Sequence, residues 1–143
     1  MRRRVIIACI IITTGCLSLP PKDRASRGIE AIHTGLVAAQ TAESDLFDAG
    51  LLPGFDDPAF HTKLADAFRL NGNLATFLIM WQPGESIPIQ LAELSVVVRD
   101  LVAIVTVYTN DEIDIVLIGL SQALSEIGKI SQILRTAGET NNG

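Results

Sequence analysis

Apolar residues recur every three or four positions along four segments of the chain, with polar residues between them. This spacing places the apolar side chains on one face of an α-helix. Short polar connections separate the segments, which favours antiparallel packing of neighbouring helices. The helices are expected over about residues 23–49, 57–81 and 88–108, and from 109 onward. The predicted fold is therefore all-α, an antiparallel four-helix bundle.

Turn and capping residues mark the ends of these helices. Gly50 is a stop signal for the first helix. Asp57 and Pro58 fit the N-cap and first helical position of the second. Residues 109–112, Thr-Asn-Asp-Glu, fit a capping box at the start of the fourth. The segment Asn71-Gly72-Asn73 lies inside the second helix and could break or kink it.

The fourth helix has the most regular pattern, because its apolar positions step by three and four through three heptads. These positions are Ile113, Val116, Leu120, Ala123, Ile127, Ile130 and Leu134. The first helix has an inward face formed by Ile29, Ile32, Leu36 and Leu46. Beside it runs a stripe of small residues, Gly28, Ala31, Gly35, Ala38 and Ala42. Small residues allow a neighbouring backbone to approach closely, so another helix is expected to pack against this stripe.

The third helix is more apolar than a surface helix requires. Thirteen of the eighteen residues from 91 to 108 are apolar, whereas a bundle helix needs about three in seven. The β-branched run is also compatible with a strand, but the capping signal that follows it favours a helix. Arg99 and Asp100 interrupt the run, so it is not expected to span a membrane.

The apolar surplus has two explanations. Either the other helices cover the third one, or a face is kept for a partner, a second copy or an apolar ligand. In the second case the candidate partner surface comprises Trp81, Val97, Val98, Leu101, Val105 and Tyr108. Trp81 could instead cap the core at the end of the second helix.

Composition and charge narrow the possible partners. Hydrophobic residues make up 48% of the 143 residues and aromatic residues only 5%, so the apolar mass is aliphatic and suits packed helices. From Cys16 onward the chain carries eight basic and sixteen acidic residues, a net charge of −8, which opposes binding to nucleic acid or to an anionic lipid surface. Lys22, Arg24 and Arg27 form the one basic cluster of this part. The only cysteines are Cys9 and Cys16, so the body of the chain has no disulfide, redox pair or zinc–cysteine site.

Residues suited to catalysis or metal binding are few. Glu30 and His33 have the E-x-x-H spacing of di-iron bundles, which require a second such motif. The only other histidine is His61, and the acidic residue before it, Asp57, is four positions away and not three. The second E-x-x-H motif is therefore missing. The acidic residues at 111–114 are explained by the dipole at a helix start. No catalytic residue, metal ligand or cofactor is predicted, and the protein is not expected to be an enzyme.

The N-terminus has the anatomy of a secretory signal. Arg2–Arg4 precede the unbroken apolar run Val5–Ile12, which small and polar residues follow. The segment from Ile12 to Cys16 resembles the lipobox of bacterial lipoproteins, in which a small residue precedes a lipidated cysteine. Gly15 is that small residue, and Thr13 stands where the family most often has leucine. A signal cut elsewhere and an uncleaved anchor are the alternatives.

The resemblance implies cleavage between Gly15 and Cys16 and attachment of several acyl chains, such as palmitate, to Cys16. Each buried methylene contributes about 0.8 kcal/mol, so several chains bind a membrane stably whereas one binds marginally. The expected organisation is a signal peptide over residues 1–15, a lipidated tether over 16–22 and the helical domain over 23–143.

A lipid anchor implies a location in the bacterial cell envelope. Leu17, rather than aspartate, follows the cysteine, which favours the outer membrane facing the periplasm in a diderm host. The expected function is a non-enzymatic binding, adaptor or assembly role, with a protein partner or a second copy as the counterpart. The alternative is a carrier that holds an apolar ligand or a lipid in the helical domain.

Overall fold

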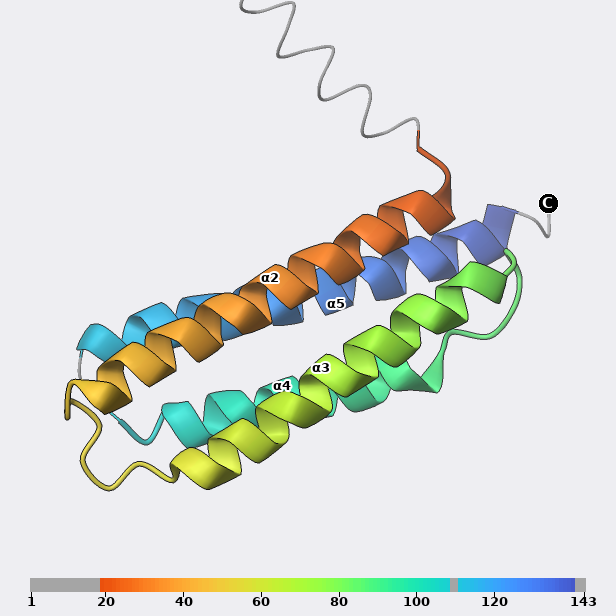
Figure 1. Cartoon of the computed structure of the whole chain (residues 1–143). Coiled ribbons are helices and arrows are strands. Elements are labelled where there is room, and N and C mark those ends of the chain that lie inside the picture. The colour runs from red at the N-terminus through yellow and green to blue at the C-terminus, as the bar shows by residue number, and fades with distance from the viewer. Residues whose placement is uncertain (1–18, 109–110, 141–143) are drawn as a thin grey trace, which may run out of the picture.

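The computed structural model describes residues 19–108 and 111–140, and it consists of helices and their connections (Figure 1). The long helices are α2 (Pro21–Asp48), α3 (Asp57–Met80), α4 (Ile89–Val105) and α5 (Asp114–Thr140), and a short 3₁₀ helix, η1 (Asp111–Ile113), precedes α5. No strand occurs in these two ranges, so the strand alternative for the third segment is wrong. The predicted all-α fold is confirmed. The expected signal and lipidation residues, Gly15 and Cys16 included, and the first two residues of the capping box lie outside the described residues.

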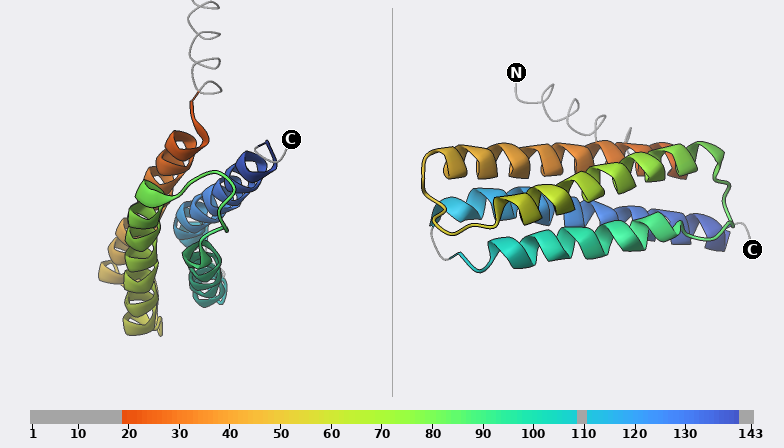
Figure 2. Two further views of the ribbon diagram at one scale, coloured as in Figure 1. Left: turned by 90° about the vertical axis from the view of Figure 1, so that its right-hand side faces the viewer. Right: turned by 60° about the horizontal axis from the view of Figure 1, so that its bottom comes forward.

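Successive helices run in opposite directions along one long axis, as Figure 2 shows from two sides. α2 packs most extensively against α5, and α3 against α4. Contacts between α2 and α3 and between α4 and α5 complete the bundle. One end of the bundle contains the start of α2, the α3–α4 loop and the end of α5; we call it the tether end, because the predicted tether leads into α2. The last two residues of that predicted tether, Pro21 and Lys22, already belong to α2. The α2–α3 loop, the end of α4 and the start of α5 form the distal end.

The helix boundaries lie close to those predicted. Gly50, just after α2, has a φ of 71°, the left-handed conformation that ends many helices and suits glycine. Asp56, rather than Asp57, is the N-cap of α3, because its carboxylate accepts a hydrogen bond from the backbone N–H of Ala59 at 3.2 Å. α4 ends at Val105, earlier than expected.

α3 continues without a break through Asn71, where the sequence allowed a kink. Asn71 is buried, and its Nδ2 donates to the backbone carbonyl oxygen of Ile29 in α2 at 3.1 Å. A buried amide needs such a partner, and a helical carbonyl can accept a second hydrogen bond. Asn71 therefore joins two helices instead of interrupting one.

The core follows the predicted stripes along the whole bundle. All seven apolar positions predicted for the fourth helix are buried. On α2, Ile29, Ile32 and Leu36 are buried as predicted, while Leu46 is half-buried against the core. Burial of these faces supplies most of the stability of the bundle, because helices in proteins owe most of their stability to the packing of an apolar face.

α2 and α5 approach closely where Gly35 faces Gly119. A Cβ atom at Gly35 would lie 2.8 Å from the carbonyl oxygen of Gly119, and one at Gly119 would lie 2.7 Å from that of Gly35. Both obstacles are backbone atoms, which cannot rotate away. At Gly28 the obstacle is the side chain of Ile130, at 2.7 Å. The predicted close approach is confirmed at Gly28 and Gly35, whereas Ala38 is exposed.

Candidate functional site

The predicted partner surface on the third helix is mostly core. Trp81 is 1% exposed, and Val98, Leu101 and Val105 are fully buried. Val97 and Tyr108 are partly buried and pack against the core, and the Tyr108 ring lies 5.2 Å from that of Phe55. The expectation that these six residues form an accessible face is therefore wrong. Their apolar surface is covered because α4 packs between α3 and α5. Across the described residues, moreover, no helix has the length and apolarity that crossing a bilayer requires.

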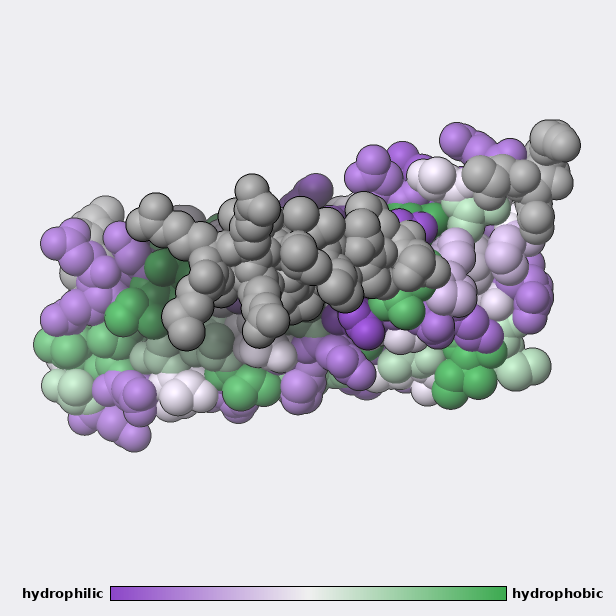
Figure 3. Space-filling view, turned by 90° about the horizontal axis from the view of Figure 1, so that it is seen from above, coloured by the Kyte–Doolittle hydropathy of each residue, from purple (hydrophilic) through white to green (hydrophobic). Residues whose placement is uncertain are grey.

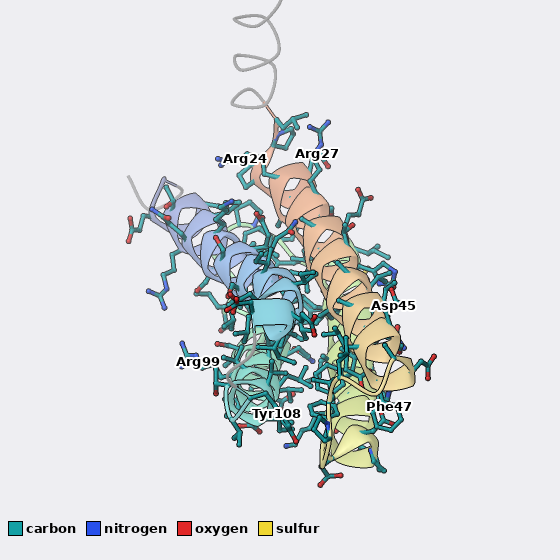
Figure 4. All side chains as sticks on the ribbon, turned by 90° about the vertical axis from the view of Figure 1, so that its left-hand side faces the viewer. Arg24, Arg27, Asp45, Phe47, Arg99 and Tyr108 are labelled. Carbon is teal, nitrogen blue, oxygen red and sulfur yellow. The ribbon has the colours of Figure 1, made fainter. Side chains whose placement is uncertain are left out.

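Basic and apolar side chains meet at the tether end. Lys22, in the first turn of α2, donates a hydrogen bond from Nζ to the backbone carbonyl of Ile79 in the last turn of α3. That carbonyl lies in the last turn of α3, where carbonyl groups have no partner within the helix, and a cation there also complements the helix dipole. Figure 4 shows Arg24 and Arg27 at the same start of α2.

Three large apolar side chains are exposed at this end, beside the loop that joins α3 to α4. Ile79 is 68% exposed, Met80 77% and Ile89 68%. We call these three residues the tether-end patch. Apolar side chains next to cations form the combination found on protein surfaces that contact lipid headgroups.

The distal end has the opposite charge. Phe47 and Asp45 lie near the end of α2 (Figure 4), and exposed apolar and acidic residues surround them. We call this end's exposed residues the distal surface, and they comprise Phe47, Leu51, Val107 and Ile115 with the carboxylates of Asp45, Asp48, Asp56, Asp111, Glu112 and Asp114. Figure 3 shows that apolar residues reach the surface near both ends of the molecule.

A groove of about 610 Å³ lies between α4 and α5. Its lining includes the apolar residues Leu91, Leu124 and Ile127, and also Arg99 and Arg135. Figure 4 shows Arg99 projecting outward from α4. Such a lining, apolar with two guanidinium groups, suits a molecule that has an apolar body and an anionic group.

Glu43, Asp57 and His61 converge near the distal end. The imidazole Nε2 of His61 lies 3.1 Å from Oε2 of Glu43 and 3.0 Å from Oδ1 of Asp57. Glu43 comes from α2 and is 0% exposed, whereas Asp57 and His61 come from the first two turns of α3 and are partly exposed. These three residues form the one group of three or more histidine, cysteine or carboxylate side chains in the described residues that could hold a metal ion.

Burial raises the pKa of the Glu43 carboxyl to about 8. The largest cause is desolvation, which disfavours the charged form. Asp57 raises the pKa of Glu43 further, because it accepts a hydrogen bond from the protonated acid and repels the charged form. Charge repulsion from Asp48 raises this pKa as well. A hydrogen bond from Ser44 acts in the opposite direction. At neutral pH the Glu43 carboxyl therefore holds a proton when no other cation is bound.

This raised pKa predicts a pH dependence of stability. Between about pH 4.5 and 8 the folded state holds a proton on Glu43 that the unfolded state has released, so stability falls as the pH rises through this window. The slope is at most about 1.4 kcal/mol per pH unit. Urea unfolding at several pH values, with a metal chelator present, should show this fall in the wild type and a smaller one in Glu43→Gln. The exposed Glu30→Gln is the control and should behave as the wild type; equal slopes in all three proteins would contradict the assignment.

Sequence reasoning missed this cluster because its residues come from two helices. Glu43 carries a signal nonetheless: Ile32, Leu36, Ala39 and Glu43 continue the three-and-four spacing of the buried face of α2. An ionisable residue at a core position requires a partner. Glu30 and His33 are both exposed, and the ring centroids of His33 and Phe68 lie 5.3 Å apart.

The chain matches no protein-family model, no curated protein and no solved structure in the three comparisons that were made.

Proposed function

We propose that the protein is a lipid-anchored component of a bacterial cell envelope, with a non-enzymatic adaptor or assembly role. Cys16 carries the lipid, and the signal is cleaved after Gly15. The observation that carries the proposal is the lipobox-like segment ending at Cys16, followed within a few residues by an independently packed helical bundle.

The short tether determines which part of the bundle stays near the membrane. Four residues lie between Cys16 and the start of α2 at Pro21. The five Cα–Cα steps span at most about 3.6 Å each, so the reach is about 18 Å. α2 has 28 residues and is about 42 Å long at a rise of about 1.5 Å per residue. The tether end therefore stays at the bilayer, while the distal end is accessible to other proteins.

The tether-end patch supports this orientation. Its exposed side chains, Ile79, Met80 and Ile89, would otherwise face water, and Lys22 bonds to the backbone of Ile79. Near an anionic lipid surface each cation contributes about 1 kcal/mol, and apolar side chains add to this when they enter the interface. The patch is thus a second, weaker membrane contact beside the lipid anchor.

The partner is proposed to bind the distal surface. Six exposed carboxylates surround apolar side chains there, and net negative charge also dominates the chain from Cys16 onward. Complementary charge steers association and selects partners, so the counterpart is expected to be a protein that presents basic residues around an apolar contact. Self-association through this surface is disfavoured, because like charges would meet.

A crosslinking experiment tests the distal surface. A photo-crosslinking residue is placed at Phe47 in one variant and at Val37 in another; both are on α2 and are about equally exposed, at 42% and 40%. A salt-sensitive crosslink to a basic envelope protein is expected from position 47 only, and it should be lost when Asp45 and Asp48 are replaced by asparagine. Equal crosslinking from both positions, or crosslinks that ignore the asparagine substitutions, would contradict the proposal.

The groove between α4 and α5 supports a carrier role as the second candidate function. Arg99 and Arg135 form no ion pair with another described residue, and the groove lining is otherwise mostly apolar. A fatty acid or similar anionic amphiphile suits it. Lipids that co-purify with the protein can be identified by mass spectrometry. A lipid that is found with the wild type, but not with a variant in which both arginines are replaced by glutamine, would favour the carrier role over the adaptor role.

A further inference from the structure

The buried carboxylate of Glu43 has an oxygen without a partner. Oε2 faces His61 and Ser44, at 3.1 and 3.5 Å. Oε1 is buried as well, and no hydrogen-bond donor reaches it within the described part of the chain. Oε1 is one of four such atoms in the described residues, with Arg24 Nε, Asn71 Oδ1 and Trp81 Nε1. Among these four it is the one that belongs to a group of possible metal ligands, where an ion bound at Oε2 could contact it as well.

No basic side chain other than His61 balances the two carboxylates of the cluster. In the described ranges, the lysine and arginine ion pairs are Lys63 with Asp100, Arg69 with Asp66 and Lys129 with Glu126. Glu43 and Asp57 are therefore left with a single imidazole between them. Two carboxylates in so small a space stay charged together only when a cation contacts both; without one, Glu43 holds a proton.

The distances between the ligand atoms fit a small divalent metal ion. In a tetrahedral zinc site with bonds of about 2.0–2.1 Å, neighbouring ligand atoms lie about 3.3 Å apart. Nε2 of His61 lies 3.1 and 3.0 Å from the carboxylate oxygens of Glu43 and Asp57. The three ligand atoms all lie within 4.8 Å of one another. One imidazole and two carboxylates are also ligands that zinc accepts, and the Asp57–His61 spacing of one helical turn puts both on one face of α3.

We propose that Glu43, Asp57 and His61 form a zinc-binding site that joins the end of α2 to the start of α3. Asp57 and His61 are partly exposed, so a metal ion has access from solvent and water can supply a fourth ligand. The ion would replace a proton at Glu43 and fix the α2–α3 connection at the distal end. This site is independent of the anchor at Cys16 and of the proposed partner, so it can fail without affecting either.

Two histidines allow a matched test, because His33 and His61 are the only ones in the chain. The full chain, purified in detergent without an affinity tag and treated with a chelator, is dialysed against zinc chloride, and bound zinc is measured by mass spectrometry. We expect one zinc per chain in the wild type and in His33→Ala, and none in His61→Ala. Zinc should raise the thermal midpoint of the first two proteins by at least about 5 °C at a hundredfold excess over Kd, and leave that of His61→Ala unchanged.

Cobalt substitution provides a second readout that does not depend on stability. Cobalt chloride should give the visible absorption of a four-coordinate site in the wild type, and Glu43→Gln should weaken or remove it while circular dichroism remains helical. Zinc that binds equally to His61→Ala, that is lost in His33→Ala, or that does not bind the wild type at all would overturn the proposal. In the last case Glu43 holds only a proton.

Discussion

Replacing Trp81 with alanine is expected to destabilise the protein by about 3–5 kcal/mol, the usual cost of removing a large aromatic side chain from a core. Trp81 follows the last residue of α3, and its side chain is among the largest that are fully buried. Its backbone N–H bonds to the carbonyl of Phe77 at 3.2 Å, and alanine retains that bond. The loss therefore measures the side chain alone.

The neighbouring residue gives the control for this prediction. Met80 precedes Trp81 directly but is 77% exposed, so Met80→Ala should change stability by no more than about 0.5 kcal/mol. Urea unfolding followed by far-UV circular dichroism measures both variants, since the only tryptophan is lost in one of them. If Trp81→Ala were as stable as Met80→Ala, Trp81 would be a surface anchor for a partner and not a core residue.

The second large effect is expected at the contact between α2 and α5. Gly119→Ala should destabilise the bundle by about 1–3 kcal/mol, because the added Cβ would meet the carbonyl oxygen of Gly35 at 2.7 Å and the backbone nitrogen of Ala39 at 2.9 Å. These atoms belong to the α2 backbone, so relief requires the two helices to move apart along their longest shared contact.

Gly128→Ala is the matched control, because it makes the same change in the same helix. No atom lies within 4 Å of the Cβ that would be added there. Alanine has a higher helix propensity than glycine, so this variant should be more stable than the wild type by about 0.5–1 kcal/mol. The two alanine variants should thus move in opposite directions in the same unfolding assay. Two shifts of the same sign would contradict the close packing of α2 on α5.

Hydrophobic periodicity predicted the fold well because burial in a bundle obeys one geometric rule. A side chain faces the core when it recurs every three or four residues, and the seven positions on the fourth helix from Ile113 to Leu134 did so without exception. Glycine and proline marked most helix ends for local steric reasons. The displaced cap at Asp56 shows the limit of this approach, since two adjacent aspartates fit the same signal.

The sequence could not decide which apolar side chains were covered. α4 is apolar almost all round, and periodicity does not distinguish a helix packed between others from one with a free face. The sequence therefore left Val98, Leu101 and Val105 open as core residues or as part of a partner surface, and they are core. Exposed apolar residues gather at the two ends of the bundle, and on α4 itself Val96 is 57% exposed.

The proposed metal-binding cluster could be recognised only from the three-dimensional arrangement of the helices. Asp57 and His61 are one helical turn apart and were noted, but the third member comes from α2. Only the packing of α2 on α3 brings Glu43 to them. Only Glu43 could have been singled out from the sequence, because it is a charged residue at a position that the three-and-four spacing of α2 predicts to be buried.

The measurement that tests the lipid anchor most directly is the intact mass of the protein extracted from bacterial membranes. The wild type is compared with Cys16→Ser and with Cys9→Ser, which changes the only other cysteine. We expect a chain that begins at Cys16 and carries the mass of acyl chains, both in the wild type and in Cys9→Ser, and an unlipidated protein in Cys16→Ser. A wild-type chain that begins at another residue, or that carries no acyl mass, would contradict the account.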